Sequence, residues 1–357
     1  MQKLLIISKE QFGYHTDIFK WCEHLRDEYD IEVITFGGKP KIELDGVKNH
    51  YVSNRGHRTI RGLRYVLTCL WHILFFKGII FVCYFKECGI LKRCFPWKKM
   101  LLDIRTLDVT NDSSVRTKQD AILKKCTDLY DFVTIISEGL RKKISLPEEK
   151  SAILPLGADI ASTTDKTFEK LNLLYVGTLF NRDVYKTIEG LAIAIKENPQ
   201  MDIYYDIVGD GIGNELAELK QLVADKKLEN HIKLHGYIQH KELKSFLDKC
   251  NIGVSFVPMT EYYEFQPATK SFEYILSGLY TIATSTYCNK EIINEENGIL
   301  IEDNPESFAN GIKEIYNRRT NIKADNIRQT LTPYLWKNIV KNKMSLILNN
   351  YKQKYES

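Results

Sequence analysis

The stretch Tyr263-Glu-Phe-Gln-Pro-Ala-Thr-Lys-Ser-Phe-Glu-Tyr-Ile-Leu-Ser-Gly278 decides the fold, together with the Leu-Tyr-Thr-Ile-Ala-Thr284 that follows it. Its apolar side chains recur three and four positions apart, which predicts a helix with one apolar face. Pro267 is suited to the first helical position because its missing N–H would be unpaired there. Gly278 is placed to end the helix. The short apolar run after it is typical of a parallel strand that is covered on both faces.

The polar side chains of this helix form a second face at spacings of three and four: Gln266, Thr269, Lys270 and Glu273. Free N–H groups at a helix N-terminus favour an anion such as phosphate. A carboxylate at Glu273, further along the helix, could accept two ribose hydroxyls. An ordinary amphipathic helix with a solvated polar face has the same pattern, so periodicity alone leaves both interpretations open.

The run "QPATKSFEYILSGLYTIAT" resembles the donor-nucleotide segment of retaining glycosyltransferases of the B-type fold, the group 1 family. The resemblance implies that Glu273 binds the donor ribose and that the preceding loop faces the diphosphate and sugar. It also assigns substrate contacts to neighbouring residues: Phe265, Gln266, Pro267, Thr269 and Lys270. Many family members carry another Glu eight positions before the ribose Glu. Phe265 occupies that position here, and the adjacent Glu264 is out of register.

The composition is that of a globular protein with room for two domains. The chain has 357 residues, of which 44% are hydrophobic and 27% charged. A net charge of +4 gives no overall nucleic-acid signature. Positive charge is nevertheless concentrated between Lys41 and Lys99, where twelve Lys and Arg face three acidic residues. Eight cysteines without a Cys-x-x-Cys pair indicate buried thiols in a reducing compartment, and we expect no metal site.

No targeting or membrane-spanning segment is expected. The apolar run from Lys3 to Ser8 is too short for a secretory signal, and Lys77-Gly78 splits the most hydrophobic stretch into two pieces. We therefore expect a cytoplasmic protein.

Apolar runs alternate with helical patterns, which predicts α/β architecture with parallel sheets. We expect strands at Leu4–Ile7, Glu32–Phe36, Ile79–Tyr84, Met100–Ile104, Phe132–Ile136, Ala152–Leu154, Leu173–Val176, Ile203–Val208, Ile232–His235, Gly253–Phe256, Tyr280–Ala283 and Ile299–Ile301. We expect helices at Thr16–Asp27, Thr59–Phe75, Lys118–Tyr130, Glu138–Lys143, Tyr185–Lys196, Asn214–Lys226, His240–Lys249 and Pro305–Asn317. A polar linker is expected at Ala161–Lys170.

Two similar halves predict two doubly wound, Rossmann-like domains that face each other across a cleft at the carboxyl ends of their strands. We place an N-terminal domain at 1–163, a C-terminal domain at 164–335 and a final helix at 336–357. The resemblance implies that the first domain binds the acceptor, that the second binds the nucleotide-sugar, and that the final helix crosses back to the first domain. A helix that only caps the second domain is the alternative.

The loop that opens the second half, Gly177-Thr-Leu-Phe-Asn-Arg182-Asp-Val-Tyr-Lys186, follows a strand and precedes a helix. Glycine lets a ligand approach the backbone. Arg182 and Lys186 are one helical turn apart, so both cations can reach the same point and stabilise a developing negative charge. Two solvated surface charges are the ordinary alternative. The resemblance makes both cations ligands of the diphosphate, and with Glu273 they are our candidate catalytic residues.

Two further strands end in glycine, at Gly209 and Gly236. The resemblance places the Gly209 loop near the donor. It also implies that backbone atoms of Gly236, Tyr237 and Ile238 contact the nucleobase. His235 is expected to be a packed strand residue rather than a catalyst.

In the first half, Gly13 and His15 follow the first strand, and the resemblance places their loop near the donor phosphates and the acceptor. A role in starting the next helix is the alternative for this segment. Arg105 and Asp108 follow the expected strand Met100–Ile104 and are further candidates for substrate contact.

Arg58, Arg61 and Arg64 alternate with Leu63, Leu67 and Trp71 in one predicted helix. A basic amphipathic helix can bind anionic lipid at a membrane surface. A helix that buries its apolar face in the core and exposes its charges is the alternative.

The sequence thus predicts a retaining, metal-independent glycosyltransferase without a cofactor, acting on a nucleotide-sugar and a saccharide or polyprenyl-linked acceptor in surface polysaccharide assembly. Peripheral contact with the inner face of the membrane is part of this hypothesis, and nucleic acid is not. A non-catalytic nucleotide-sugar-binding subunit of the same fold is one alternative. A dinucleotide-dependent oxidoreductase is another, although the first strand's loop lacks the glycine fingerprint.

Overall fold

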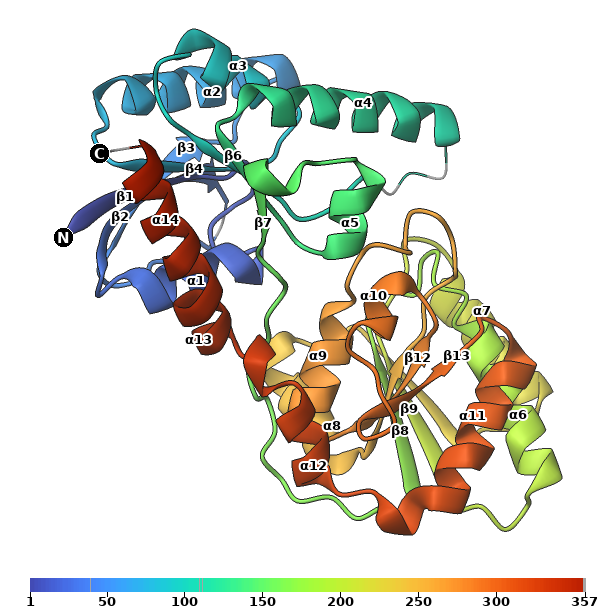
Figure 1. The fold of residues 1–357 in the computed structure, drawn as a ribbon. Coiled ribbons are helices and arrows are strands. Elements are labelled where there is room, and N and C mark those ends of the chain that lie inside the picture. The colour runs from blue at the N-terminus through green and yellow to red at the C-terminus, as the bar shows by residue number, and fades with distance from the viewer. Residues whose placement is uncertain (39, 109, 111, 356–357) are drawn as a thin grey trace. The chain divides into compact units, whose positions relative to one another are not determined.

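The computed structural model of the chain describes residues 1–38, 40–108, 110 and 112–355. The chain divides into two compact units (Figure 1): Met1–Leu156 with Trp336–Ser357, and Gly157–Leu335. The division after Leu156 comes earlier than the expected boundary at 163. Within its described part, the final segment packs on the first unit, as the bond from the Tyr29 hydroxyl to Asn349 shows.

Seven parallel strands form the sheet of the first unit, in the order β3-β2-β1-β4-β5-β6-β7. The strands are β1 (Gln2–Ile7), β2 (Tyr29–Gly37), β3 (Val47–Ser53), β4 (Ile79–Cys83), β5 (Leu101–Ile104), β6 (Phe132–Ile135) and β7 (Ser151–Ile153). The central strands β1 and β4 carry continuous apolar runs whose side chains are almost fully buried, because helices cover both faces of a parallel sheet.

The first unit's helices lie in two layers (Figure 1). Its helical segments are α1 (Thr16–Leu25), α2 (Arg58–Phe75), α3 (Gly89–Cys94), α4 (Ser113–Leu129), α5 (Glu138–Lys143), α13 (Trp336–Ile339) and α14 (Ser345–Tyr355), with a π-helical turn at Val340–Met344 and a 3-10 turn at Glu148–Lys150. Helices α2, α3 and α4 pack in sequence with one another, whereas α1 packs against α13 and the π-helical turn. In the described part of the chain, no helix combines the length and the apolar character that crossing a membrane requires.

The second unit has six parallel strands in the order β10-β9-β8-β11-β12-β13, which is the doubly wound arrangement of nucleotide-binding sheets. The strands are β8 (Leu171–Val176), β9 (Ile203–Val208), β10 (Ile232–Gly236), β11 (Ile252–Ser255), β12 (Tyr280–Thr284) and β13 (Gly298–Ile301). The helices are α6 (Tyr185–Glu197), α7 (Glu215–Asp225), α8 (Leu243–Lys249), α9 (Thr269–Leu276), α10 (Tyr287–Lys290), α11 (Pro305–Arg318) and α12 (Ala324–Thr330), with 3-10 turns at His240–Glu242, Arg319–Asn321 and Thr332–Tyr334.

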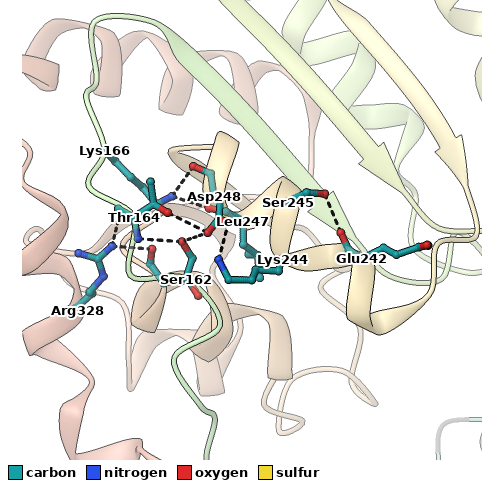
Figure 2. A network of polar contacts seen from close by, with 10 residues as sticks. Ser162, Thr164, Lys166, Glu242, Lys244, Ser245, Leu247, Asp248 and Arg328 are labelled. Carbon is teal, nitrogen blue, oxygen red and sulfur yellow. Dashed lines mark hydrogen bonds and ion pairs between the residues drawn. The ribbon is translucent and has the colours of Figure 1, made fainter.

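The expected linker at 161–170 is instead a packed strap on the second unit (Figure 2). The Ser162 hydroxyl donates to the Asp248 carboxylate at 2.6 Å, and the Lys166 ammonium donates to the Leu247 carbonyl at the same distance. The guanidinium of Arg328 donates to the Thr164 carbonyl at 2.6 Å. Polar composition predicts a linker here, but the Ser162 and Lys166 side chains bond to the end of α8.

Several elements depart from the expected pattern. The strand β3, Val-Lys-Asn-His-Tyr-Val-Ser, was not expected because an edge strand can be polar and only half-buried. Helix α9 begins at Thr269 with Ala268 as its N-cap residue, so Pro267 lies before the helix and not at its first position. The final helix is interrupted by the π-helical turn.

Candidate active site

Three glycine turns meet at the carboxyl ends of the neighbouring strands β8, β9 and β10. The Gly177 amide donates to the Val208 carbonyl at 3.0 Å, and the Gly209 amide donates to the Gly236 carbonyl at 2.9 Å. Gly177 and Gly209 have φ angles of 153° and 150°, which side chains rarely adopt. A Cβ on Gly209 would lie 1.8 Å from the Gly177 carbonyl oxygen, so this close approach requires glycine.

Two cations lie over aromatic rings beside these turns. The Lys270 ammonium is 3.8 Å from the centre of the Tyr175 ring and 3.7 Å from the place a Cβ would take on Gly177. The Arg182 guanidinium carbon is 4.3 Å from the centre of the Tyr263 ring. Neither cation forms an ion pair with a described residue. Cation–π contact stabilises them without neutralising their charge.

Burial lowers the pKa of both cations, and the charge of Arg182 adds to the effect on Lys270. Burial, and then the charge of Arg182, hold the pKa of Lys270 well below its usual range. Burial also lowers the pKa of Arg182. Both cations therefore lack the stabilisation that an anion would supply. An anion bound between them would be held strongly, because charges interact more strongly away from water.

Glu273 lies on the same helix as Lys270, one turn further along, and no described residue forms a hydrogen bond with its carboxylate. Burial raises the pKa of Glu273 to about 7, and the charge of Asp159 adds to the effect. Hydrogen-bond donors that favour the charged form would reverse this shift. A pair of vicinal hydroxyls, as on a ribose, supplies such donors.

Lys186 does not share the position of Arg182. Helix α6 begins at Tyr185, and Asp183 before it has a φ of 49°, so the expected helical spacing of the two cations is absent. The Lys186 ammonium lies 2.9 Å from the Asp183 carboxylate and 3.9 Å from that of Asp303. Burial alone would lower its pKa, but the hydrogen bond and charge of Asp183 outweigh burial and raise it.

The loop before α9 holds Phe265, at the position where many family members carry a glutamate, and the adjacent Glu264. The Glu264 carboxylate accepts a hydrogen bond from the Tyr287 amide at 2.8 Å, so it is occupied at the start of α10. The Phe265 ring packs 5.5 Å from the Tyr287 ring. Gln266 Nε2 is buried and has no hydrogen-bond partner in the described chain. Thr269 is exposed in the first turn of α9.

The residues after β10 have different surroundings. Tyr237 is 77% exposed, whereas Ile238 packs against the buried cluster that includes Leu247. His235 Nε2 lies 2.7 Å from the Asp206 carboxylate, which confirms that this histidine is a packed strand residue.

The first unit has its own cavity of about 320 Å³ at the carboxyl ends of β1, β4 and β5. His15 lines this cavity, and Gly13, with a φ of 82°, turns the chain toward it. The Asp103 carboxylate, fully buried, accepts from the Thr134 hydroxyl at 2.7 Å and leaves its other oxygen without a partner in the described residues. Burial raises the pKa of Asp103 to about 6.

Arg105 also lines the cavity, but its nitrogens are already bonded to the protein. Nε donates to Asp17 at 2.6 Å, and the other nitrogens donate to the carbonyls of Leu154 and Pro155. The side chain thus connects β5 to α1 and to the segment after β7. The other candidate of this region, Asp108, accepts a hydrogen bond from the Thr110 amide.

Sequence reasoning missed the aromatic partners Tyr175 and Tyr263. Tyr263 stands in the stretch that decides the fold and Tyr175 lies in the expected strand Leu173–Val176, yet cation–π pairing across distant segments leaves no local pattern. Tyr175, two residues before the Gly177 turn, was the available signal.

Residues 162–331 match the family model described as glycosyl transferases group 1. A search of curated proteins gave no match. Among solved structures, sucrose-phosphate synthase (tll1590) from Thermosynechococcus elongatus is 17% identical with a TM-score of 0.76, covering 99% of this chain and 100% of that one. Anabaena Alr3699/HepE in complex with UDP and glucose is 14% identical with a TM-score of 0.76, covering 98% and 100%. The lipopolysaccharide outer core galactosyltransferase WaaB is 13% identical with a TM-score of 0.73, covering 98% and 99%. The chain has the B-type glycosyltransferase fold, and its second unit matches the group 1 family of glycosyltransferases.

Proposed function

We propose that the chain is a retaining glycosyltransferase that moves a sugar from a nucleotide-sugar to a saccharide or lipid-linked saccharide. The observation that carries this proposal is the pair Arg182 and Lys270, two cations without a carboxylate partner beside the glycine turns. In this account they hold the diphosphate, and Glu273 accepts hydrogen bonds from the ribose. Binding of UDP by Anabaena HepE, a protein of the same fold, agrees with a nucleotide donor.

Charge stabilisation is the main catalytic contribution that we assign to the protein. As the sugar–phosphate bond breaks, negative charge grows on the leaving diphosphate, where Arg182 and Lys270 stabilise it. The leaving phosphate then takes the proton of the attacking hydroxyl, so no side-chain base is required. Because two cations supply the positive charge, we propose that the transfer is metal-independent and uses no cofactor. Lys186, held by Asp183, has a secondary place in this account.

The remaining second-unit candidates have supporting roles in the proposal. The exposed Thr269 at the start of α9 would contact phosphate, and the unpartnered amide of Gln266 would contact the sugar. The backbone after Gly236 would contact the base. Phe265 would border the sugar without a charged contact.

We propose that the first unit binds the acceptor in the cavity lined by His15 and Asp103. Helix α2 gives this unit a surface suited to lipid: Leu63, Leu67, Trp71 and Phe75 are 55–65% exposed on it. Arg58, Arg61 and Arg64 accompany this apolar stripe. The arrangement favours an anionic membrane surface and hence a lipid-linked acceptor in surface polysaccharide assembly. The buried thiols suit the reducing, cytoplasmic side of that membrane.

A non-catalytic nucleotide-sugar-binding subunit is the second candidate, because Phe265 stands where many family members have a glutamate and Glu264 is bonded elsewhere. Thermal-shift screening with UDP, GDP, ADP and dTDP identifies the base, since a ligand of the folded state raises its stability. The corresponding nucleotide-sugar is then incubated with the protein. Slow release of free nucleoside diphosphate supports the enzyme, whereas stable binding without release supports the subunit.

A further inference from the structure

Three side chains that commonly ligate metals come together at the edge of the first unit's sheet: Glu32 on β2, His50 on β3 and His72 on α2. One potential ligand atom of each lies within 4.8 Å of those of the other two. His50 Nε2 is 2.7 Å from the Glu32 carboxylate, and the rings of His50 and His72 have centroids 4.2 Å apart. The three residues come from separate segments, so the fold and not local sequence creates the cluster.

We propose that Glu32, His50 and His72 bind one divalent transition-metal ion, with Zn²⁺ as the probe. Two imidazoles and one carboxylate form a zinc ligand set that leaves a fourth position open. Bonds of about 2.0–2.2 Å to a shared tetrahedral ion would place the ligand atoms roughly 3.3 Å apart. The ion would therefore replace the hydrogen bond between His50 and Glu32 and require only small side-chain movements.

The charge state of the cluster suits a cation. Burial, with the nearby His50, lowers the pKa of His72, which favours the neutral imidazole that a metal requires. Burial alone would raise the pKa of Glu32, but the hydrogen bond from His50 and the charge of Lys48 outweigh it and lower the pKa. The Lys48 ammonium is 3.7 Å from the Glu32 carboxylate and competes with an ion there. Its side chain is 67% exposed, so it can move into solvent when an ion binds.

The site also has an entrance and an open coordination position. Glu32 and His72 line a cavity of about 340 Å³ together with Trp71 and Phe75, and this cavity can admit the ion and a water ligand. Among the described strands, the edge strand β3 pairs only with β2. An ion bound by all three residues would join this edge strand to β2 and α2. None of the three ligands belongs to the proposed transfer site.

The test measures Zn²⁺ binding to the EDTA-treated full chain by competition dialysis, in a Cys94→Ser background because Cys94 is the exposed thiol. We expect one Zn²⁺ per chain. Glu32→Gln and His72→Ala should each weaken binding by at least about 100-fold, because even changes to residues that only support a ligand cost 10–100-fold. His240→Ala, an exposed histidine of the second unit, is the matched control and should bind like the parent. Far-UV circular dichroism checks that each variant is folded.

Substitution with Co²⁺ provides a readout of ligand type and coordination geometry in addition to affinity. The parent should show the visible absorption of tetrahedral Co²⁺ without a thiolate charge-transfer band, and His72→Ala should lose it. Raised thermal stability with Zn²⁺ in the parent, absent in Glu32→Gln, would further support a site that joins the three elements. Failure of the parent to bind Zn²⁺, equal affinity in the folded variants, or a thiolate band would overturn the proposal.

Discussion

The ammonium of Lys270 lies over the ring of Tyr175, 3.8 Å from its centre, and has no carboxylate partner among the described residues. This contact stabilises a cation at the glycine turns without neutralising it. The positive charge of Arg182 is close enough to lower the pKa of Lys270 further. The charged form of Lys270 is therefore destabilised in the ligand-free site, and a bound anion would stabilise it.

Diphosphate binding should take up protons through Lys270. Free Lys270 has a lowered pKa, and a bound anion favours its charged form and raises that pKa. The affinity should consequently fall as pH rises through the lowered pKa. Calorimetry at one pH, in buffers of different ionisation enthalpy, measures the uptake. Lys270→Met should reduce it and Lys186→Met should not, so equal uptake in the parent and both variants would refute this linkage.

Glu273 should make the ligand-free protein less stable as pH rises from about 4.5 to about 7. Burial raises its pKa in the folded state from 4.5 to about 7, so within this window the folded protein holds a proton that the unfolded chain has lost. Stability decreases with pH under that condition. We expect a loss of roughly 3 kcal/mol across the window. Urea unfolding at several pH values should show this slope reduced in Glu273→Gln, and an unchanged slope would contradict the assignment.

Gly209 should not tolerate even a methyl group. Gly209→Ala would place Cβ against the Gly177 carbonyl at a φ of 150°, and we expect a loss of about 2–4 kcal/mol in unfolding free energy. Gly213→Ala is the control, because its nearest neighbour, the Glu215 carboxylate, would lie 3.4 Å away. Urea denaturation should leave this control within about 0.5 kcal/mol of the parent. Similar stabilities for the two variants would mean that the turns are not in close contact.

Helix α2 should bind anionic vesicles through its basic and apolar residues. Changing Arg58, Arg61 and Arg64 to Glu should weaken sedimentation with anionic vesicles by at least about 100-fold, since each basic residue contributes about 1 kcal/mol. The control variant changes three exposed lysines of the second unit, Lys196, Lys220 and Lys226, to Glu. It alters the net charge by the same amount as the arginine variant and should weaken vesicle binding less. If both variants lose vesicle binding equally, net charge alone explains the binding. If neither variant loses vesicle binding, α2 is not the membrane contact.

Much of the fold could be predicted because buried parallel strands have continuous apolar runs, as in β1 and β4, that stand out from their surroundings. The glycine turns were equally visible, since Gly177 and Gly209 adopt conformations that few other residues can. Side-chain pairing across distant segments could not be predicted. The sequence placed Lys186 beside Arg182 by helical spacing, but a left-handed Asp183 separates them and pairs with Lys186. The aromatic partners of Lys270 and Arg182 were hidden for the same reason.

Calorimetric titration of the best-binding nucleoside diphosphate, compared with its nucleoside, tests the central claim most directly. If Arg182 and Lys270 hold the diphosphate, Lys270→Met should weaken diphosphate binding by about 10- to 100-fold, as expected for a charged hydrogen bond of roughly 1.5–3 kcal/mol, and leave nucleoside binding nearly unchanged. Lys186→Met, whose cation is already paired with Asp183, should have a much smaller effect. Undiminished diphosphate affinity in a folded Lys270→Met protein would contradict the account.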